Sequence, residues 1–363
     1  MAQKKVALYT IQSVNYGNRL QNYAAQEFLT SMGCDVFSLR NSARGSQTEV
    51  LLQLHPWLRA VKPVVPIVHD LKIRICGMLC LDKDDNYRRF DRLIRFTDDY
   101  LGPDGFSASV TEYDAVIAGS DQIWNTEFEF VSLYSFFPFA HPCKIAFSSS
   151  FGVDQITRND EIVKCLKDFK AISVREDAGA AIVWELADRK AEVLVDPTML
   201  ISPDQWRKIA RKPKGMEDKP YVLTYFLSAK CEKANCRLEK LKKQLCVYEL
   251  FDTGNAVTRC AGPAEFLYLI DHASIVLTDS FHACVFSFLF GKPFIVYDRN
   301  RGGSTMNSRL TTLLKKFDLE RKYEGSGLDN DIWEHDYSTG YTHLNLEKEK
   351  ALNFLKSALG DTD

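Results

Sequence analysis

A short segment in the last third of the chain carries the residue types of proton chemistry. It reads Thr278-Asp279-Ser280-Phe281-His282-Ala283, between one apolar run and the next. Amide groups at the start of a helix attract anions, and an imidazole there can exchange a proton near neutral pH. The segment predicts an active site with His282 as the acid, Asp279 as a candidate base and Ser280 as an anion-binding position. The alternative is a histidine in the apolar core.

Two further segments end apolar runs with polar side chains. Ser173-Val174-Arg175-Glu176 offers a guanidinium that can bind phosphate or carboxylate through paired hydrogen bonds, unless it is a surface Arg-Glu pair. The run from 119 to 125 combines a small-residue turn with a carboxylate, amides and an indole, as carbohydrate sites do. Its alternative is a buried tryptophan beside an Asx-type turn. The candidate residues of this run are Ser120, Asp121, Gln122, Trp124 and Asn125.

The loop after the first apolar run resembles a binding loop, and Asn15, Asn18 and Gln21 are its candidate cleft residues. Arg309, ahead of an apolar-periodic stretch, is a further candidate anion ligand in the same cleft. The chain contains no G-x-G-x-x-G, P-loop, H-E-x-x-H or G-x-S-x-G motif, so dinucleotide, P-loop, zinc-protease and serine-hydrolase readings lack support.

The elements that must position these residues alternate between strand and helix. Strands are expected at residues 6–10, 35–39, 113–118, 143–148, 171–174, 191–195, 221–226, 246–251, 274–278 and 293–297. Such alternation predicts parallel sheets that bind ligands at the carboxyl ends of their strands. The predicted fold class is therefore α/β, with two doubly wound Rossmann-like domains facing a cleft.

A polar segment over 201–219, rich in proline and lysine, is typical of a domain linker. We expect an N-terminal α/β domain over 1–200, a C-terminal α/β domain over 201–345, and a terminal helix and tail over 346–363. An insertion about 50–100 interrupts the first domain. Its basic amphipathic stretch, 55–81, is interpreted as a helical insertion packed on that domain or, alternatively, as a contact with an anionic membrane surface.

Bulk properties narrow the class of protein. The 363 residues, 45% of them hydrophobic, fit two globular domains, and a net charge of −2 argues against a nucleic-acid partner. No signal peptide or long apolar run is visible, so a cytoplasmic protein is expected, with peripheral contact at the inner face of the membrane as the alternative. The ten cysteines show no C-x-x-C spacing, so they predict reduced core residues and no metal site. The sequence carries no signal of oligomeric state.

Several of these segments together resemble the polysaccharide pyruvyl transferase family. The segments are 15–18 with Gln21 and Asn22, 118–125, 173–176, 195–198, 278–282 and 291–294. They occur in order between about residue 5 and about residue 320. The resemblance implies a fold like the GT-B glycosyltransferases. It also implies transfer of the enolpyruvyl-derived group of phosphoenolpyruvate to a sugar of a cell-surface polysaccharide precursor, forming a pyruvate ketal, with the family's histidine at His282 and its arginine at Arg175.

Phosphoenolpyruvate carries a phosphate and a carboxylate, which suit Arg175, Arg309 and the helix start at Ser280, with Ser120 beside them. His282 would protonate the methylene carbon, and Asp121 or Asp279 would take a proton from the acceptor, which is a sugar and, in one reading, lipid-linked. The donor is a substrate, so no cofactor is expected. Two other functions stay open: a GT-B glycosyltransferase that uses a nucleotide sugar, and a non-catalytic glycan-binding or assembly protein.

Overall fold

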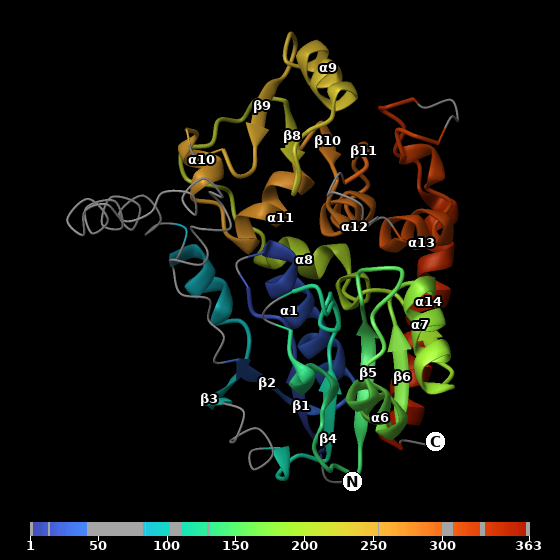
Figure 1. The fold of residues 1–363 in the computed structure, drawn as a ribbon. Helices are drawn as coiled ribbons and strands as arrows, with labels where there is room; N and C mark the ends of the chain where they lie inside the picture. Colours follow the sequence, from blue (N-terminus) through green and yellow to red (C-terminus); the bar gives the residue numbers. More distant parts are fainter. Residues whose placement is uncertain are drawn as a thin grey trace, which may run out of the picture.

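The computed structural model describes residues 3–13, 15–41, 83, 85–101, 110–128, 131–252, 254–299, 308–326 and 331–360. Two α/β units lie end to end, and the strands of one sheet point toward the strands of the other (Figure 1). The carboxyl ends of both sheets therefore meet at a common seam. This arrangement confirms the expected α/β fold with two Rossmann-like sheets facing one another.

The first sheet has seven parallel strands in the order β3-β2-β1-β4-β5-β6-β7. Its strands are β1 (Lys5–Tyr9), β2 (Asp35–Asn41), β3 (Phe96–Leu101), β4 (Ala115–Ala118), β5 (Lys144–Ser149), β6 (Ala171–Val174) and β7 (Glu192–Val193). The central strands β4 and β5 are buried along their whole length, as expected where helices cover both faces of a parallel sheet. The order reverses between β1 and β4, and such a reversal is where open parallel sheets bind ligands.

The second sheet has four parallel strands in the order β11-β10-β8-β9. Its strands are β8 (Tyr221–Tyr225), β9 (Cys246–Glu249), β10 (Ile275–Thr278) and β11 (Phe294–Val296). Its order also reverses, between β10 and β8. Each sheet thus directs the loops at its own reversal point into the seam.

The helices complete the layers. The longer helices of the first unit are α1 (Tyr16–Ser31), α6 (Asp160–Asp168) and α7 (Asp177–Ala187). Those of the second are α9 (Glu232–Leu241), α11 (Pro263–Asp271), α12 (Phe281–Leu289) and α13 (Ser308–Lys316), and α10 (Ala256–Arg259) is a single short turn. α8 (Pro203–Ile209) lies between the sheets (Figure 1). The 3-10 turns are η1 (Leu133–Phe136), η2 (Pro197–Met199) and η3 (Glu320–Lys322).

The last helix, α14 (Ser338–Leu359), contacts both units. Near its start the Tyr341 hydroxyl donates a hydrogen bond to the carbonyl of Phe288 in α12, 2.9 Å away. At its end the Lys4 ammonium donates to the carbonyl of Leu359 over 2.6 Å. The helix begins before residue 346, where the sequence analysis began it, and it fastens the second unit to the first.

Aromatic rings form a second junction between the units. Tyr16, at the start of α1, packs with its ring centroid 4.9 Å from that of Phe266 in α11 and 5.7 Å from that of Tyr225 in β8. All three side chains are buried. The start of α1 is therefore held directly against the second sheet, so residues of both units are placed in fixed register at the seam.

The expected strands lie within a residue or two of the observed ones, but one observed strand was not expected and one is shorter than expected. β3 falls inside the segment treated as an insertion, and it pairs with β2 at the sheet edge. β7 is shorter than the expected strand at 191–195, because Asp196 already begins the turn into η2. The stretch 55–81 lies outside the described residues. No helix in the described part of the chain is both long and apolar enough to cross a membrane.

Candidate active site

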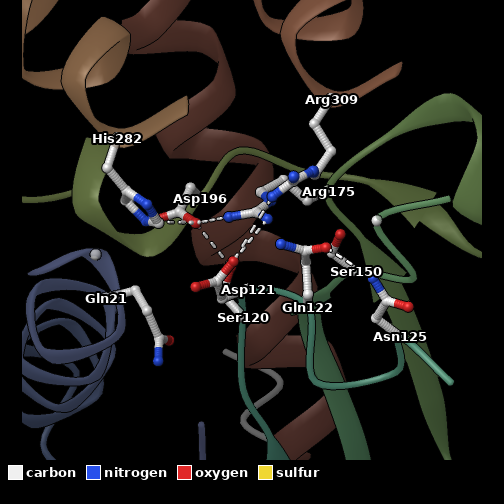
Figure 2. A network of polar contacts seen from close by, with 12 residues as sticks. Gln21, Ser120, Asp121, Gln122, Asn125, Ser150, Arg175, Asp196, His282 and Arg309 are labelled. Atoms are coloured by element: carbon white, nitrogen blue, oxygen red, sulfur yellow. Dashed lines mark hydrogen bonds and ion pairs between the residues drawn. The ribbon is translucent and has the colours of Figure 1, made fainter. Parts of the chain in front are cut away.

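Polar residues from the strand ends of the first sheet converge on one point of the seam (Figure 2). Asp121 follows β4, Arg175 follows β6 and Asp196 follows β7. His282 and Arg309 reach the same point from the starts of α12 and α13. The convergence follows from parallel topology, because the carboxyl ends of neighbouring strands lie side by side.

Arg175 is the hub of this cluster. One guanidinium nitrogen donates a hydrogen bond to Asp196 over 2.6 Å, and the other terminal nitrogen donates to Asp121 over 3.1 Å. Its side chain is 1% exposed, so both ion pairs lie in a medium of low dielectric constant. Its planar group also stacks 4.3 Å from the ring centroid of Phe281 in α12. Arg175 therefore connects two strand ends of the first sheet to a helix of the second unit.

The two carboxylates are ionised in this environment. Burial raises the pKa of Asp196, but Arg175, His282 and hydrogen bonds from Thr198 outweigh it and lower the value to about 2. Burial likewise raises the pKa of Asp121, yet Arg175, His282 and Arg309 hold it below its ordinary value. Asp121 also adopts a left-handed backbone conformation, with φ of 62°, which is uncommon outside glycine and occurs often at functional sites.

His282 lies between the carboxylates and the start of α1. Its Nε2 atom is 3.8 Å from Asp196 and has no hydrogen-bond partner among the described residues. Burial lowers the pKa of His282, and the two aspartates only partly offset this effect, so the free imidazole is neutral at pH 7. An unpartnered, buried ring nitrogen beside two carboxylates is available to carry a proton to a ligand.

The ring of His282 also rests directly on Gly17. A Cβ atom built at position 17 would meet Nδ1 of His282 at 2.1 Å and its Cε1 at 2.4 Å. Gly17→Ala is therefore expected to displace the imidazole and to reduce kcat roughly tenfold, since displacements of about 1 Å at a reacting group cost up to about 10² in rate. Steady-state kinetics beside a thermal melt would measure the effect.

The matched control is Gly340→Ala in α14. A Cβ atom there would meet Phe288 and the carbonyl oxygen of Phe317, each at 2.8 Å, but none of the clustered residues. This variant is expected to lose stability and to keep kcat. If both variants lost kcat in proportion to stability, the contact between Gly17 and His282 would have no role of its own.

Arg309 is the residue of this cluster best suited to bind an anion. The residue is 4% exposed, its Nε atom has no hydrogen-bond partner among the described residues, and its ion pair with Asp121 spans 3.8 Å. Burial and the neighbouring arginines Arg175 and Arg299 lower its pKa to about 9. A buried guanidinium without a close counter-charge is costly, and an anionic ligand would remove that cost.

Helix starts add to the positive potential at the seam. α1, α12 and α13 all begin at this cluster: α1 contributes Gly17 and Asn18, α12 contributes His282, and α13 contributes Arg309. Ser280 precedes α12 and makes no side-chain capping bond, so its own hydroxyl does not occupy the amides of that first turn. Helix starts carry a partial positive charge, and three of them beside Arg309 favour an anion.

Ser120, Asn18 and Gln122 surround this cluster. The Ser120 hydroxyl donates to Asp196 over 2.9 Å, and the Asn18 amide donates to Asp121. Gln122 lies in the same view, and its amide oxygen accepts from Asn125 over 2.8 Å. Ser120 and Asn18 are thus within the site, but their observed bonds orient the carboxylates.

The interpretation of Trp124 as a stacking platform is wrong. Its side chain is 0% exposed, its indole N–H donates to the carbonyl of Ser135 over 2.9 Å, and its ring packs on Phe136 and Phe151. Asn125 is a turn residue, since its amide oxygen accepts from the backbone N–H of Glu127. Both belong to the core beneath the loop and present no surface to an acceptor.

Asp279 is also misassigned as a candidate base. Its two carboxylate oxygens accept backbone N–H bonds from Leu227 and Ser228, of 2.7 and 2.9 Å, and the Ser228 hydroxyl adds a third bond. These bonds tie the end of β10 to the loop after β8. A carboxylate occupied in this way stabilises the second sheet, and Asp121 remains the base candidate.

The remaining candidates have structural contacts. Asn15 caps α1, because its side chain accepts from the backbone N–H of Gly17. Gln21 is buried in α1, donates to the carbonyl of Asn18 over 3.1 Å, and lies apart from the arginines in Figure 2. Neither reaches the cluster of Arg175 and His282.

Two cluster residues were missed as site candidates. Asp196 accepts from Arg175, and Glu176 accepts from the Ser150 hydroxyl over 2.9 Å and the backbone N–H of Phe151 over 3.0 Å. Burial raises the pKa of Glu176, although Arg175 and Arg309 oppose it. Both follow expected strands, and that position was the signal that would have identified them.

Comparison with known proteins identifies a family and a similar fold. A model of the polysaccharide pyruvyl transferase family matches residues 15–301. Curated proteins yield no significant sequence match. Among solved structures, a putative UDP-N-acetylglucosamine 2-epimerase from Listeria monocytogenes is similar, with a TM-score of 0.51 and 11% identity over 100% of this chain and 98% of that chain. The S. aureus protein described as an MnaA-UDP co-structure has a TM-score of 0.49 and 9% identity over 99% and 97%.

At 11% identity, the similarity to the Listeria structure shows a shared two-domain, GT-B-like fold and nothing about the substrate. The family match is different in kind, because it spans most of the chain and includes Arg175 and the turn that bears His282. The resemblance noted from the sequence is thereby confirmed. On this evidence the chain belongs to the polysaccharide pyruvyl transferase family.

Proposed function

We propose that the protein transfers the enolpyruvyl-derived group of phosphoenolpyruvate to a sugar of a cell-surface polysaccharide precursor and forms a pyruvate ketal. The observation that carries this proposal is Arg309, a buried guanidinium whose nearest described carboxylate is 3.8 Å away, next to an unpartnered imidazole nitrogen. A donor that must bind through negative charge and then accept a proton fits such a pair. Family membership gives the transferase class.

The donor's phosphate and carboxylate would be held by Arg309, Arg175 and the amides at the start of α12. The Nε atoms of both arginines lack a hydrogen-bond partner among the described residues, but the two terminal nitrogens of Arg175 are already bound to Asp196 and Asp121. We therefore assign Arg309 the direct contact with the donor, whereas Arg175 mainly adds positive electrostatic potential to the site. Ser280 and Ser120 lie at the edge of this donor site.

The reaction balances with the groups present. His282 donates a proton to the methylene carbon, which becomes the methyl group, and C2 gains cationic character. One acceptor hydroxyl attacks C2 and gives its proton to Asp121. A second hydroxyl then attacks C2, the C2–O bond to phosphate breaks, and phosphate leaves with that hydroxyl's proton. Transfer of the Asp121 proton to His282, directly or through water, resets the site; no cofactor or metal enters the proposal.

His282 is neutral in the free enzyme and must be protonated before it can act as the acid. Burial lowers the pKa of the free imidazole below 6.5, so a proton must be gained for acid catalysis at neutral pH. A bound donor brings negative charge to within a few ångströms, and a nearby anion favours the protonated form. Donor binding would thus load the acid that the donor then uses.

The pH dependence follows from this coupling. For the free enzyme the active form is protonated, so kcat/KM for the donor is expected to fall as pH rises through a value below 6.5. In the donor complex the pKa of His282 is higher, so the corresponding limb of kcat should lie at higher pH. Profiles of both constants from pH 5 to pH 8 would measure the two limbs. Coincident limbs would contradict coupling between the donor charge and His282.

The direct test is incubation with phosphoenolpyruvate and a panel of acceptors, simple galactosides and lipid-linked sugars included. Phosphate and a ketal methyl group should form in equal amounts, as measured colorimetrically and by proton NMR. Calorimetry with uridine and guanosine diphosphate sugars separates the glycosyltransferase alternative. Nucleotide-sugar binding without phosphoenolpyruvate binding or phosphate release would overturn the proposal. Flotation with anionic liposomes separately tests the alternative interpretation of residues 55–81 as a contact with an anionic membrane surface.

A further inference from the structure

A phenol hydroxyl lies unused beside the cluster. Tyr225 is the last residue of β8, at the reversal point of the second sheet, and its side chain is 1% exposed. Its hydroxyl has no hydrogen-bond partner among the described residues. The hydroxyl interacts electrostatically with Tyr16, Arg299, Asp279 and Asp121. It is thus both buried and within the field of the candidate active site.

The packing around Tyr225 gives its hydroxyl no structural role. The ring of Tyr225 packs against Phe251 and Phe266, with centroids 5.3 and 5.4 Å away, so phenylalanine would suit the packing at position 225. Leaving a buried hydroxyl unpaired costs free energy that a phenylalanine would avoid. Burial raises the pKa of Tyr225 well above its ordinary value, so the group remains a hydrogen-bond donor at any working pH. A donor of this kind is explained by a partner that arrives with the ligand.

The position of Tyr225 indicates which ligand that is. Its ring contacts Tyr16, the neighbour of Gly17, and Gly17 lies against the imidazole of His282. Tyr225 therefore approaches from the α1 side of His282. Arg175 and Arg309, the anion-binding groups, enter from β6 and α13. Asp121 is itself among the groups that interact with the Tyr225 hydroxyl. With the donor anion held by Arg175 and Arg309, a second, neutral substrate that meets Asp121 would therefore lie on the side of Tyr225.

We propose that Tyr225 is a substrate-contacting residue whose O–H donates a hydrogen bond to an oxygen of the acceptor sugar next to Asp121. The inference rests on the proposed function and names a contact that holds the acceptor. A sugar offers many hydroxyl and ring oxygens as acceptors, and a rigid phenol donor orients one of them at little entropic cost. Tyr225 takes no proton in the reaction; it positions the hydroxyl that Asp121 deprotonates.

The test compares Tyr225→Phe with two matched controls. Tyr297→Phe removes a hydroxyl that is also buried, and its neighbours are Arg237, Glu324 and Cys231. Tyr16→Phe removes the neighbouring phenol, whose hydroxyl also lacks a hydrogen-bond partner among the described residues and interacts with Glu265. For each variant the thermal midpoint and the KM values for phosphoenolpyruvate and for a galactoside acceptor are measured.

For Tyr225→Phe we expect KM for the acceptor to rise about tenfold or more, as loss of one hydrogen bond to a ligand implies. KM for phosphoenolpyruvate and the thermal midpoint should stay at wild-type values or, for the midpoint, increase. Both controls should keep the wild-type acceptor KM. Unchanged acceptor KM, or a rise confined to the donor KM, would overturn the Tyr225 assignment while the proposed function stands. A wild-type protein that releases no phosphate with any acceptor would overturn both.

Discussion

Replacing His282 with glutamine is expected to reduce kcat by about 10²- to 10⁴-fold, the range typical of removing a general acid. Glutamine keeps much of the buried volume and can donate a hydrogen bond, but it cannot supply a proton to carbon. Because the imidazole that is removed is neutral, the substitution should change the free energy of unfolding little. KM for the donor should shift only a few-fold, because Arg309 and Arg175 supply the charge that holds it. Steady-state kinetics of phosphate release would measure these effects.

His272→Gln is the matched control for this substitution. His272 is exposed at the end of α11 and stacks on Tyr268, with ring centroids 3.8 Å apart, away from the cluster. It should retain wild-type kcat. A second readout follows the proton itself: in D₂O the ketal methyl group formed by the wild-type enzyme should carry one deuterium. Full kcat in His282→Gln would remove the imidazole from the chemical step.

Replacing Arg309 with methionine is expected to lower kcat/KM for phosphoenolpyruvate about 100-fold, which corresponds to loss of a charge-assisted hydrogen bond or a bidentate pair. The same change should leave the protein as stable as the wild type or more so. The reason is that Arg309 is a buried cation whose Nε atom lacks a partner among the described residues, and methionine fills similar space without a charge to desolvate. Loss of donor affinity together with a gain in stability would show that the Arg309 guanidinium serves ligand binding and not the fold.

Donor kinetics and urea unfolding of the same preparation would measure both quantities. Arg321→Met is the matched control, since Arg321 forms an exposed ion pair with Glu334 over 3.2 Å, outside the site. That variant should change neither quantity by much, as exposed ion pairs contribute little. An Arg309→Met protein that is destabilised but binds phosphoenolpyruvate normally would show that the guanidinium serves the fold through Asp121.

Local sequence patterns identified much of the framework of this protein. Short apolar runs located most of the strands, and the start of α12 was expected at Ser280, although that side chain makes no capping bond. Since the carboxyl ends of parallel strands share one edge, Arg175 and Asp121 were expected to meet, and the expected cleft between two such domains brought His282 to the same place. Placing a residue at a strand end requires only neighbours along the chain, so sequence was sufficient for it.

Contacts between distant segments determined the roles. Asp279 and Asp121 both follow strands, yet the loop after β8 occupies Asp279 with backbone N–H bonds, whereas Asp121 faces Arg175, Arg309 and His282. Trp124 lies in a polar loop by sequence, but η1 and its neighbours enclose it. Arg309 became informative only because the packed seam buries it without a close partner. Sequence therefore determined which residues reach the seam, and only the tertiary structure decided which remain unsatisfied there, because hydrogen-bond partners and burial depend on how separate strands and helices pack together.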